Sequence, residues 1–131
     1  MKYSVSQSKL QDYLALKVDD GDLFPNEAPK GTPFLDLSQG AGPAVILTKE
    51  SALGAMKAFL DGRAPFERLI AWSDTMMLSD LFPWADYGED DSLEEALSDL
   101  NDLDEKSVSG VDPSLRWKAV EEIYQKLAHS I

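Results

Sequence analysis

Apolar side chains recur at the three- and four-residue spacing of an α-helix in several separate segments of the chain. This spacing puts the apolar residues of each segment on one face, which is the pattern of helices that pack against one another. The connections between most of these segments are short, as they are in a helical bundle. The pattern predicts a mainly α fold, a small bundle of four to five helices in a single domain spanning residues 1–131, with helices at 7–17, 49–60, 65–79, 92–103 and 113–127.

Residues with known preferences for helix ends support these boundaries. Thr48 is suited to an N-cap, because its hydroxyl accepts a free N–H of the first turn. Gly62 suits the left-handed position after a helix, and Pro65 suits the first position of the next. The sequence Asp-Ser-Leu-Glu at 91–94 has the form of a capping box with an acidic cap residue. The first helix has a competing interpretation as a strand, in which Leu14, Leu16 and Val18 alternate.

The segment 19–43 lacks helical periodicity and is dense in Gly and Pro, which predicts a long irregular connection. Long loops within compact domains are often functional. Two short apolar runs, 34–37 and 44–47, flank the end of this segment. They predict one short β-hairpin near residues 34–47.

The charge of the protein is concentrated in one part of the chain. Its 131 residues include 24 acids and 12 bases, a net charge of −12. The segment 80–105 has 11 acids and no base, so it accounts for nearly all of that charge. Helix surfaces usually mix signs, because opposite charges four residues apart stabilise a helix by about 0.2–0.5 kcal/mol. The missing bases therefore indicate an interaction surface, with a simple solvated face as the alternative.

The candidate binding residues lie in this acidic segment. Trp84 and Tyr87 stand in a loop at its edge, bounded by Pro and Gly, and aromatic residues of this kind often anchor interfaces. An alternative role for Trp84 is to close the core over the loop. The other aromatic residues at helical spacing are expected in the core: Phe59, Phe66, Trp72 and Trp117. The candidate acidic contacts are Asp86, Glu89, Asp90, Asp91, Glu94, Glu95, Asp99 and Asp102.

Residues that carry common catalytic chemistry are scarce. There is no cysteine, and the one histidine, His129, lies within the last three residues, where helices fray. Serine-hydrolase, Walker A and dinucleotide motifs are absent, and residues 99–104 match neither the spacing nor the Gly of an EF-hand loop. Carboxylates on an open acidic surface make poor general acids, because tuning their pKa requires burial or a specific partner. We therefore expect no catalytic residue, cofactor or metal site, and a protein that is not an enzyme.

The same charge limits the possible partners. Nucleic acid and anionic membranes attract cationic proteins, so neither is an expected partner. The longest apolar run, 44–47, is far shorter than the ~20 residues of a membrane span. The N-terminal segment has no apolar core of a signal peptide, so we expect a cytoplasmic location. The expected partner is a basic protein.

One stretch of the chain resembles a known family of proteins that bind a protein partner. In Leu53–Trp72, Phe59-Leu60-Asp61-Gly62 is followed by Leu69-Ile70-Ala71-Trp72. This stretch of about 20 residues is similar to the helix–Gly turn–helix of small bacterial toxin-immunity proteins, of the colicin-type and contact-dependent growth-inhibition families. The resemblance implies a cytoplasmic antitoxin that binds one cognate toxin domain, often a nuclease. It implies no residue-level roles, because these families diverge most at their binding surfaces.

Two hypotheses follow. In the first, the protein inhibits a basic toxin, a nuclease, through the acidic segment 80–105. In the second, it is an acidic nucleic-acid mimic or adaptor that binds several basic proteins. Mimics spread their charge over a long face, whereas the other 105 residues here are nearly neutral. An enzyme that uses buried carboxylates is a third and weaker alternative.

Overall fold

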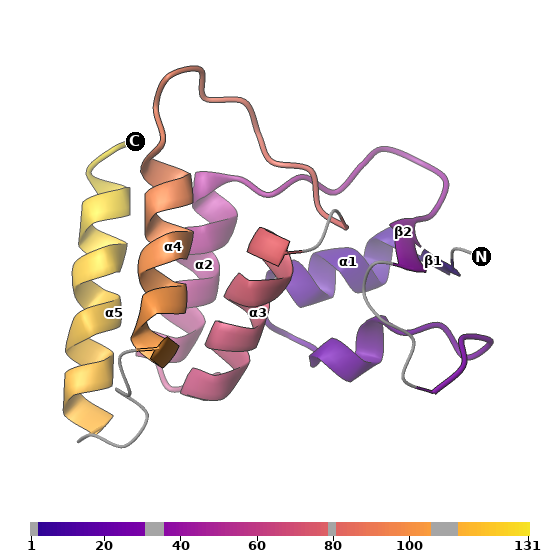
Figure 1. The fold of residues 1–131 in the computed structure, drawn as a ribbon, viewed down its shortest axis with the longest axis horizontal. Coiled ribbons are helices and arrows are strands. Elements are labelled where there is room, and N and C mark those ends of the chain that lie inside the picture. The colour runs from indigo at the N-terminus through magenta and orange to yellow at the C-terminus, as the bar shows by residue number, and fades with distance from the viewer. Residues whose placement is uncertain (1–2, 31–35, 79–80, 106–112) are drawn as a thin grey trace.

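The computed structural model describes residues 3–30, 36–78, 81–105 and 113–131, and its fold is mainly α-helical (Figure 1). Within these ranges, five α-helices, one short 3-10 helix and a two-stranded sheet are present. This confirms the expected class of a small helical bundle with a short β element. In chain order the elements are β1 (Tyr3–Val5), α1 (Gln7–Leu14), η1 (Asp20–Leu23), β2 (Leu37–Gln39), α2 (Lys49–Leu60), α3 (Phe66–Leu78), α4 (Ser92–Glu105) and α5 (Pro113–Ala128).

Helix α2 lies at the centre of the bundle. It packs against α3, α4 and α5, and α4 in turn packs against both α3 and α5. Helix α1 and the sheet lie beyond α3, at the opposite side of the molecule from α5 (Figure 1). The N-terminal ends of α2 and α4 and the C-terminal end of α5 meet at one end of the bundle (Figure 1).

Small side chains allow the neighbouring helices to approach α2 closely. Its fully buried apolar residues are Met56 and three alanines, Ala52, Ala55 and Ala58. Three larger apolar residues of the same helix are only partly buried: Leu53, Phe59 and Leu60. The buried face is therefore rotated from the one that large apolar residues predict, and it begins with Lys49.

The turn between α2 and α3 forms as expected. Gly62 has φ +79°, the left-handed conformation that glycine adopts without steric cost. Its N–H donates to the Phe59 carbonyl at 3.0 Å, and the N–H of Arg63 donates to the Ala58 carbonyl at 2.8 Å, the two bonds of a Schellman motif. Helix α3 begins at Phe66, one residue later than the expected start at Pro65, and helix boundaries commonly differ by one or two residues.

Helix α1 is shorter than expected, and the alternative strand is absent. It ends at Leu14 because Leu16 takes a left-handed conformation with φ +57°. The N–H groups of Leu16 and Lys17 then donate to the carbonyls of Tyr13 and Asp12 at 2.9 and 2.8 Å. A left-handed leucine is strained, but this side chain is only 5% exposed. Burial of the leucine offsets the local strain.

The short sheet forms with a different partner from the expected hairpin. Strand β2 pairs in parallel with β1, with Ser38 opposite Ser4, and residues 34–35 of the expected hairpin lie outside the described residues. The second run pairs elsewhere, since Leu47 forms a parallel bridge with Trp84. Between the two runs, the Gln39 side-chain amide accepts from the Val45 N–H and donates to the Val45 carbonyl, both at 2.8 Å. These side-chain bonds replace the ladder that a hairpin would form.

Aromatic burial follows the expected pattern with one exception. Trp72 and Phe66 are buried and Phe59 packs partly against the core, but Trp117 is 40% exposed. Its indole N–H donates to the Leu60 carbonyl at 2.9 Å. Trp117 therefore covers the C-terminal end of α2, where carbonyls lack partners within the helix, and is not a core residue.

Candidate functional site

The acidic segment is described from Leu81 to Glu105, and a backbone bridge at Trp84 joins it to Leu47, just before α2. The Leu47 N–H donates to the Pro83 carbonyl and the Ala85 N–H donates to the Leu47 carbonyl, both at 2.8 Å. Residues 85–91, which we call the acidic loop, then pass over the N-terminal end of α2 and enter α4 (Figure 1). Asp80, the first acid of the segment, lies outside the described residues.

Trp84 closes the end of α3 and also reaches the surface. Its indole N–H donates to the Met76 carbonyl at 3.1 Å, which satisfies a carbonyl in the last turn of the helix. The residue is nevertheless 36% exposed. Trp84 thus contacts the end of α3 and leaves part of its side chain accessible.

Tyr87 is held against the first turn of α2. Its hydroxyl oxygen accepts from the backbone N–H of Lys49 at 2.9 Å, one of the N–H groups that a helix start leaves without an internal partner. The Lys49 ammonium lies 4.6 Å from the centroid of the tyrosine ring, in cation–π geometry. The side chain expected to anchor a partner is therefore joined to the fold through its hydroxyl group and its ring.

Lys49 is a buried lysine that the sequence patterns did not single out. Only 4% of the residue is exposed, and its ammonium group forms an ion pair with Asp90 and donates to the Ser130 carbonyl at 3.3 Å. A signal was present in the sequence, because Lys49, Ala52 and Met56 share one helix face at i, i+3 and i+7. That signal is weak, since a lysine at a helix start is usually exposed.

Asp90 is the carboxylate with the most internal contacts in the acidic loop. Besides Lys49, it accepts from the backbone N–H of Ser92 at 3.0 Å and from its hydroxyl at 2.6 Å. The hydrogen bond from Lys49, assisted by those from Ser92, holds the pKa of Asp90 well below its usual range. Asp90 therefore stabilises the loop, although its side chain is still 39% exposed.

The other candidate carboxylates mostly face solvent. Asp86, Glu89, Asp91, Glu94 and Glu95 are exposed, whereas Asp99 and Asp102 are half-buried. Asp86 accepts from the Gly88 N–H at 2.8 Å, which shapes the turn of the loop. We call these seven residues the acidic surface. Among the described residues, the structure records one ion pair to this set, from Lys126 to Glu95 at 3.4 Å.

A shallow groove between α4 and α5 brings part of the acidic surface together. It has a volume of about 350 Å³ and is lined by Asp91, Glu94, Glu95, Ser98, Asp99 and Lys126. The loop supplies one carboxylate and α4 supplies three, two from its first turn and one from the next. The other candidates do not line this groove. Tyr87 and Asp90 contact Lys49 instead. Four candidates neither line the groove nor have a recorded contact with Lys49: Trp84, Asp86, Glu89 and Asp102.

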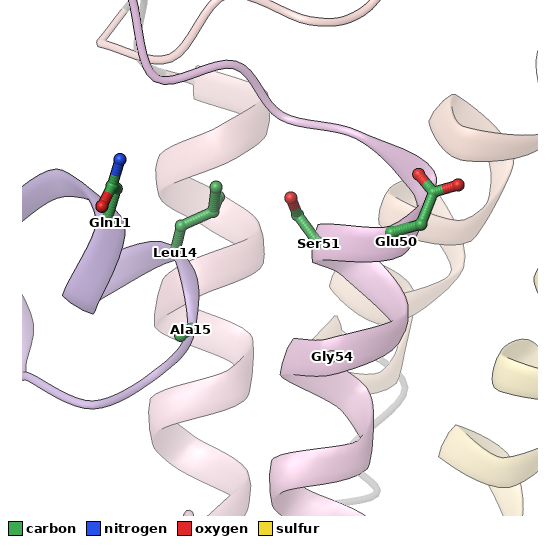
Figure 2. A pocket seen from close by; sticks show the side chains of 6 residues that line it. All are labelled: Gln11, Leu14, Ala15, Glu50, Ser51 and Gly54. Carbon is green, nitrogen blue, oxygen red and sulfur yellow. The ribbon is translucent and has the colours of Figure 1, made fainter.

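A second depression separates α1 from α2 and has a volume of about 360 Å³ (Figure 2). Leu14 of α1 and Ala15, which follows that helix, line one side, with Ser51 and Gly54 facing them from α2 (Figure 2). Glu50 is its one titratable lining residue.

No group of three or more His, Cys, Asp or Glu side chains among the described residues is placed to hold a metal ion. None of the described helices is both long and apolar enough to cross a membrane.

Comparisons with protein-family models, with curated proteins and with solved structures find no match for the chain.

Proposed function

We propose that this protein is an immunity-type inhibitor, which binds a basic toxin domain through the acidic surface and blocks it. The proposed target is a nuclease, and the proposed location of the complex is the cytoplasm. In this role the protein is a stoichiometric binder and not an enzyme. The observation that carries the proposal is a set of exposed carboxylates, grouped on the acidic loop and on one helix, with few bases beside them.

The amphipathic character of α4 supports this role. Its apolar residues Leu93, Ala96, Leu97 and Leu100 are buried, so the helix is fixed to the core. Its carboxylates therefore project from a supported element, and their geometry is set before a partner arrives. Such preorganisation favours binding, because less conformational freedom is lost when the complex forms.

Charge complementarity supports a nuclease as the target. A nuclease presents Lys and Arg to the phosphates of its substrate, and a row of carboxylates can occupy the same positions. Opposite potentials also steer the partners together, and association rate constants then approach ~10⁸–10⁹ M⁻¹s⁻¹ at low salt. Localised charge favours one cognate partner over the several partners of a nucleic-acid mimic, whose charge would cover a longer face.

The proposal is tested first by recovering partners of the tagged protein from its source cell. We expect one basic protein that is toxic when expressed alone and harmless when expressed together with this chain. Recovery of several unrelated DNA-binding proteins would favour the mimic instead. A partner that is harmless by itself would contradict the immunity role.

The acidic surface is tested with two triple variants of equal charge. One carries Glu89→Gln, Glu94→Gln and Glu95→Gln, and the control carries Glu27→Gln, Glu50→Gln and Glu122→Gln, which lie outside the acidic segment. We expect the first to lower the association rate constant with the recovered partner by roughly tenfold and to weaken its salt dependence. Equal effects of both variants would show that net charge, and not this surface, determines binding.

A further inference from the structure

The Lys49 ammonium joins three segments that are distant in sequence. It contacts Asp90 and the ring of Tyr87 in the acidic loop and the carbonyl of Ser130 after α5, and it belongs to the buried face of α2. The remaining buried residues of that face are Ala52, Ala55, Met56 and Ala58. A methionine or leucine would continue this face without the desolvation cost of a buried charge. The presence of a lysine therefore calls for a role beyond packing.

The acidic loop has few other polar attachments to the fold. Within it, the Asp90 N–H donates to the Tyr87 carbonyl at 3.2 Å and Gly88 donates to Asp86, both of which are local bonds. Asp90 and Asp91 also accept hydrogen bonds from the first turn of α4, which the loop enters directly. Apart from these, the polar contacts recorded from residues 86–91 to other described elements go to Lys49. Its backbone N–H and its ammonium group fix the loop at two points, Tyr87 and Asp90.

We infer that Lys49 is a positioning residue, which holds the acidic loop in one conformation so that its carboxylates meet a basic partner already ordered. This inference rests on the proposed function for the identity of the partner. Lys49 itself does not contact the partner, because it is buried. It acts through Asp90 and Tyr87, which fix the path of the chain between Asp86 and Asp91. Ordering the loop in the free protein reduces the entropy lost on binding.

Replacing Lys49 separates the positioning role from simple charge attraction, because the two predict opposite changes in the affinity for a basic protein. Replacing a lysine with methionine makes the protein more negative, so charge alone predicts tighter binding to a basic protein. If Lys49 positions the loop, Lys49→Met weakens that binding despite the added negative charge. Lys57→Met is the matched control, since Lys57 lies on the same helix, is exposed and lies outside the loop contacts.

The experiment combines amide hydrogen exchange with binding of egg-white lysozyme, a folded basic probe, at about 20 mM salt, where screening is weak. We expect Lys49→Met to accelerate exchange in residues 86–91 by at least tenfold and to weaken lysozyme binding at least threefold. Lys57→Met should leave exchange unchanged and bind lysozyme equally or more tightly. Asp90→Asn removes the negative charge of the same ion pair from its exposed side, leaves α2 unaltered, and should accelerate exchange in the same residues.

Circular dichroism and the unfolding midpoint establish that each variant is folded at the measuring temperature. Unchanged exchange in 86–91 for both Lys49→Met and Asp90→Asn would overturn the inference. Faster exchange with equal or tighter lysozyme binding would also overturn it, because the ordered loop would then not serve binding. If the wild-type protein does not bind lysozyme, the proposed basic-partner surface fails, and hydrogen exchange alone decides whether Lys49 orders the loop.

Discussion

At the scale of single residues, the acids of one segment have different environments. Asp90 is bound by a buried ammonium group and by Ser92, while Glu89 lies beside it in solvent. Glu95 has an exposed ion pair with Lys126, of the kind that contributes about 0–1 kcal/mol. The sequence places all of these acids in one segment, but it does not show which of them the fold uses internally.

The depressed pKa of Asp90 predicts a specific response to acid. A carboxyl whose pKa is lower in the folded protein stabilises the fold above its ordinary value of 3.8, and that contribution is lost as the pH falls below this value. We therefore expect the wild-type protein to be more stable than Asp90→Asn at pH 7, with a difference that narrows below pH 3.8. Urea unfolding across this range measures the difference. Glu89→Gln is the control and should differ little from the wild type throughout, whereas parallel curves for wild type and Asp90→Asn would contradict the assignment.

At the scale of elements, helix ends are determined by backbone conformation together with burial. Gly62 ends α2 in a left-handed conformation that the sequence signals clearly. Leu16 adopts the same conformation after α1, where no glycine marks the position, because the surrounding core takes up its side chain. The first helix end could be predicted from residue type, and the second could not, since its cause is a tertiary contact.

Gly54, inside α2, and Gly62, in the turn after it, offer a matched test of whether backbone conformation determines the end of this helix. A Cβ atom at Gly54 or at Gly62 would meet no atom within 4 Å, so neither substitution by alanine creates a clash. Gly54→Ala should stabilise the protein by about 0.5–1 kcal/mol, because alanine favours a helix interior. Gly62→Ala should destabilise it by about 1 kcal/mol, because only its φ of +79° disfavours alanine. Urea unfolding checks both values, and changes of the same sign would contradict the conformational explanation.

At the scale of the whole molecule, the net charge of −12 is distributed unevenly. The exposed acids of the loop and of α4 repel one another, while the described bases near them are the buried Lys49 and the exposed Lys126. Such self-repulsion destabilises the compact state. A binding surface of like charges is therefore expected to lower the stability of the free protein.

This repulsion predicts that added salt stabilises the free protein. The Debye length falls from ~30 Å at 0.01 M to ~3 Å at 1 M, so NaCl screens the exposed acids more than the enclosed pair of Lys49 and Asp90. We expect the thermal midpoint at pH 7 to rise by a few degrees over this range. The rise should be smaller in the triple variant of Glu89, Glu94 and Glu95, and KCl should act in the same way as NaCl. A midpoint that falls with salt would show that ion pairs outweigh the repulsion.

The sequence by itself determined the helical class, the ends of α2, the entry into α4 and α5, and the location of the acids. These features depend on local periodicity, cap residues and composition, which act within a few neighbouring residues. Tertiary structure alone decided that β2 pairs with β1, that Leu16 ends α1, and that Lys49 is buried against Asp90 and Tyr87. Each of these features joins or buries residues through contacts distant in the chain, and such contacts leave no periodic trace in the sequence around them.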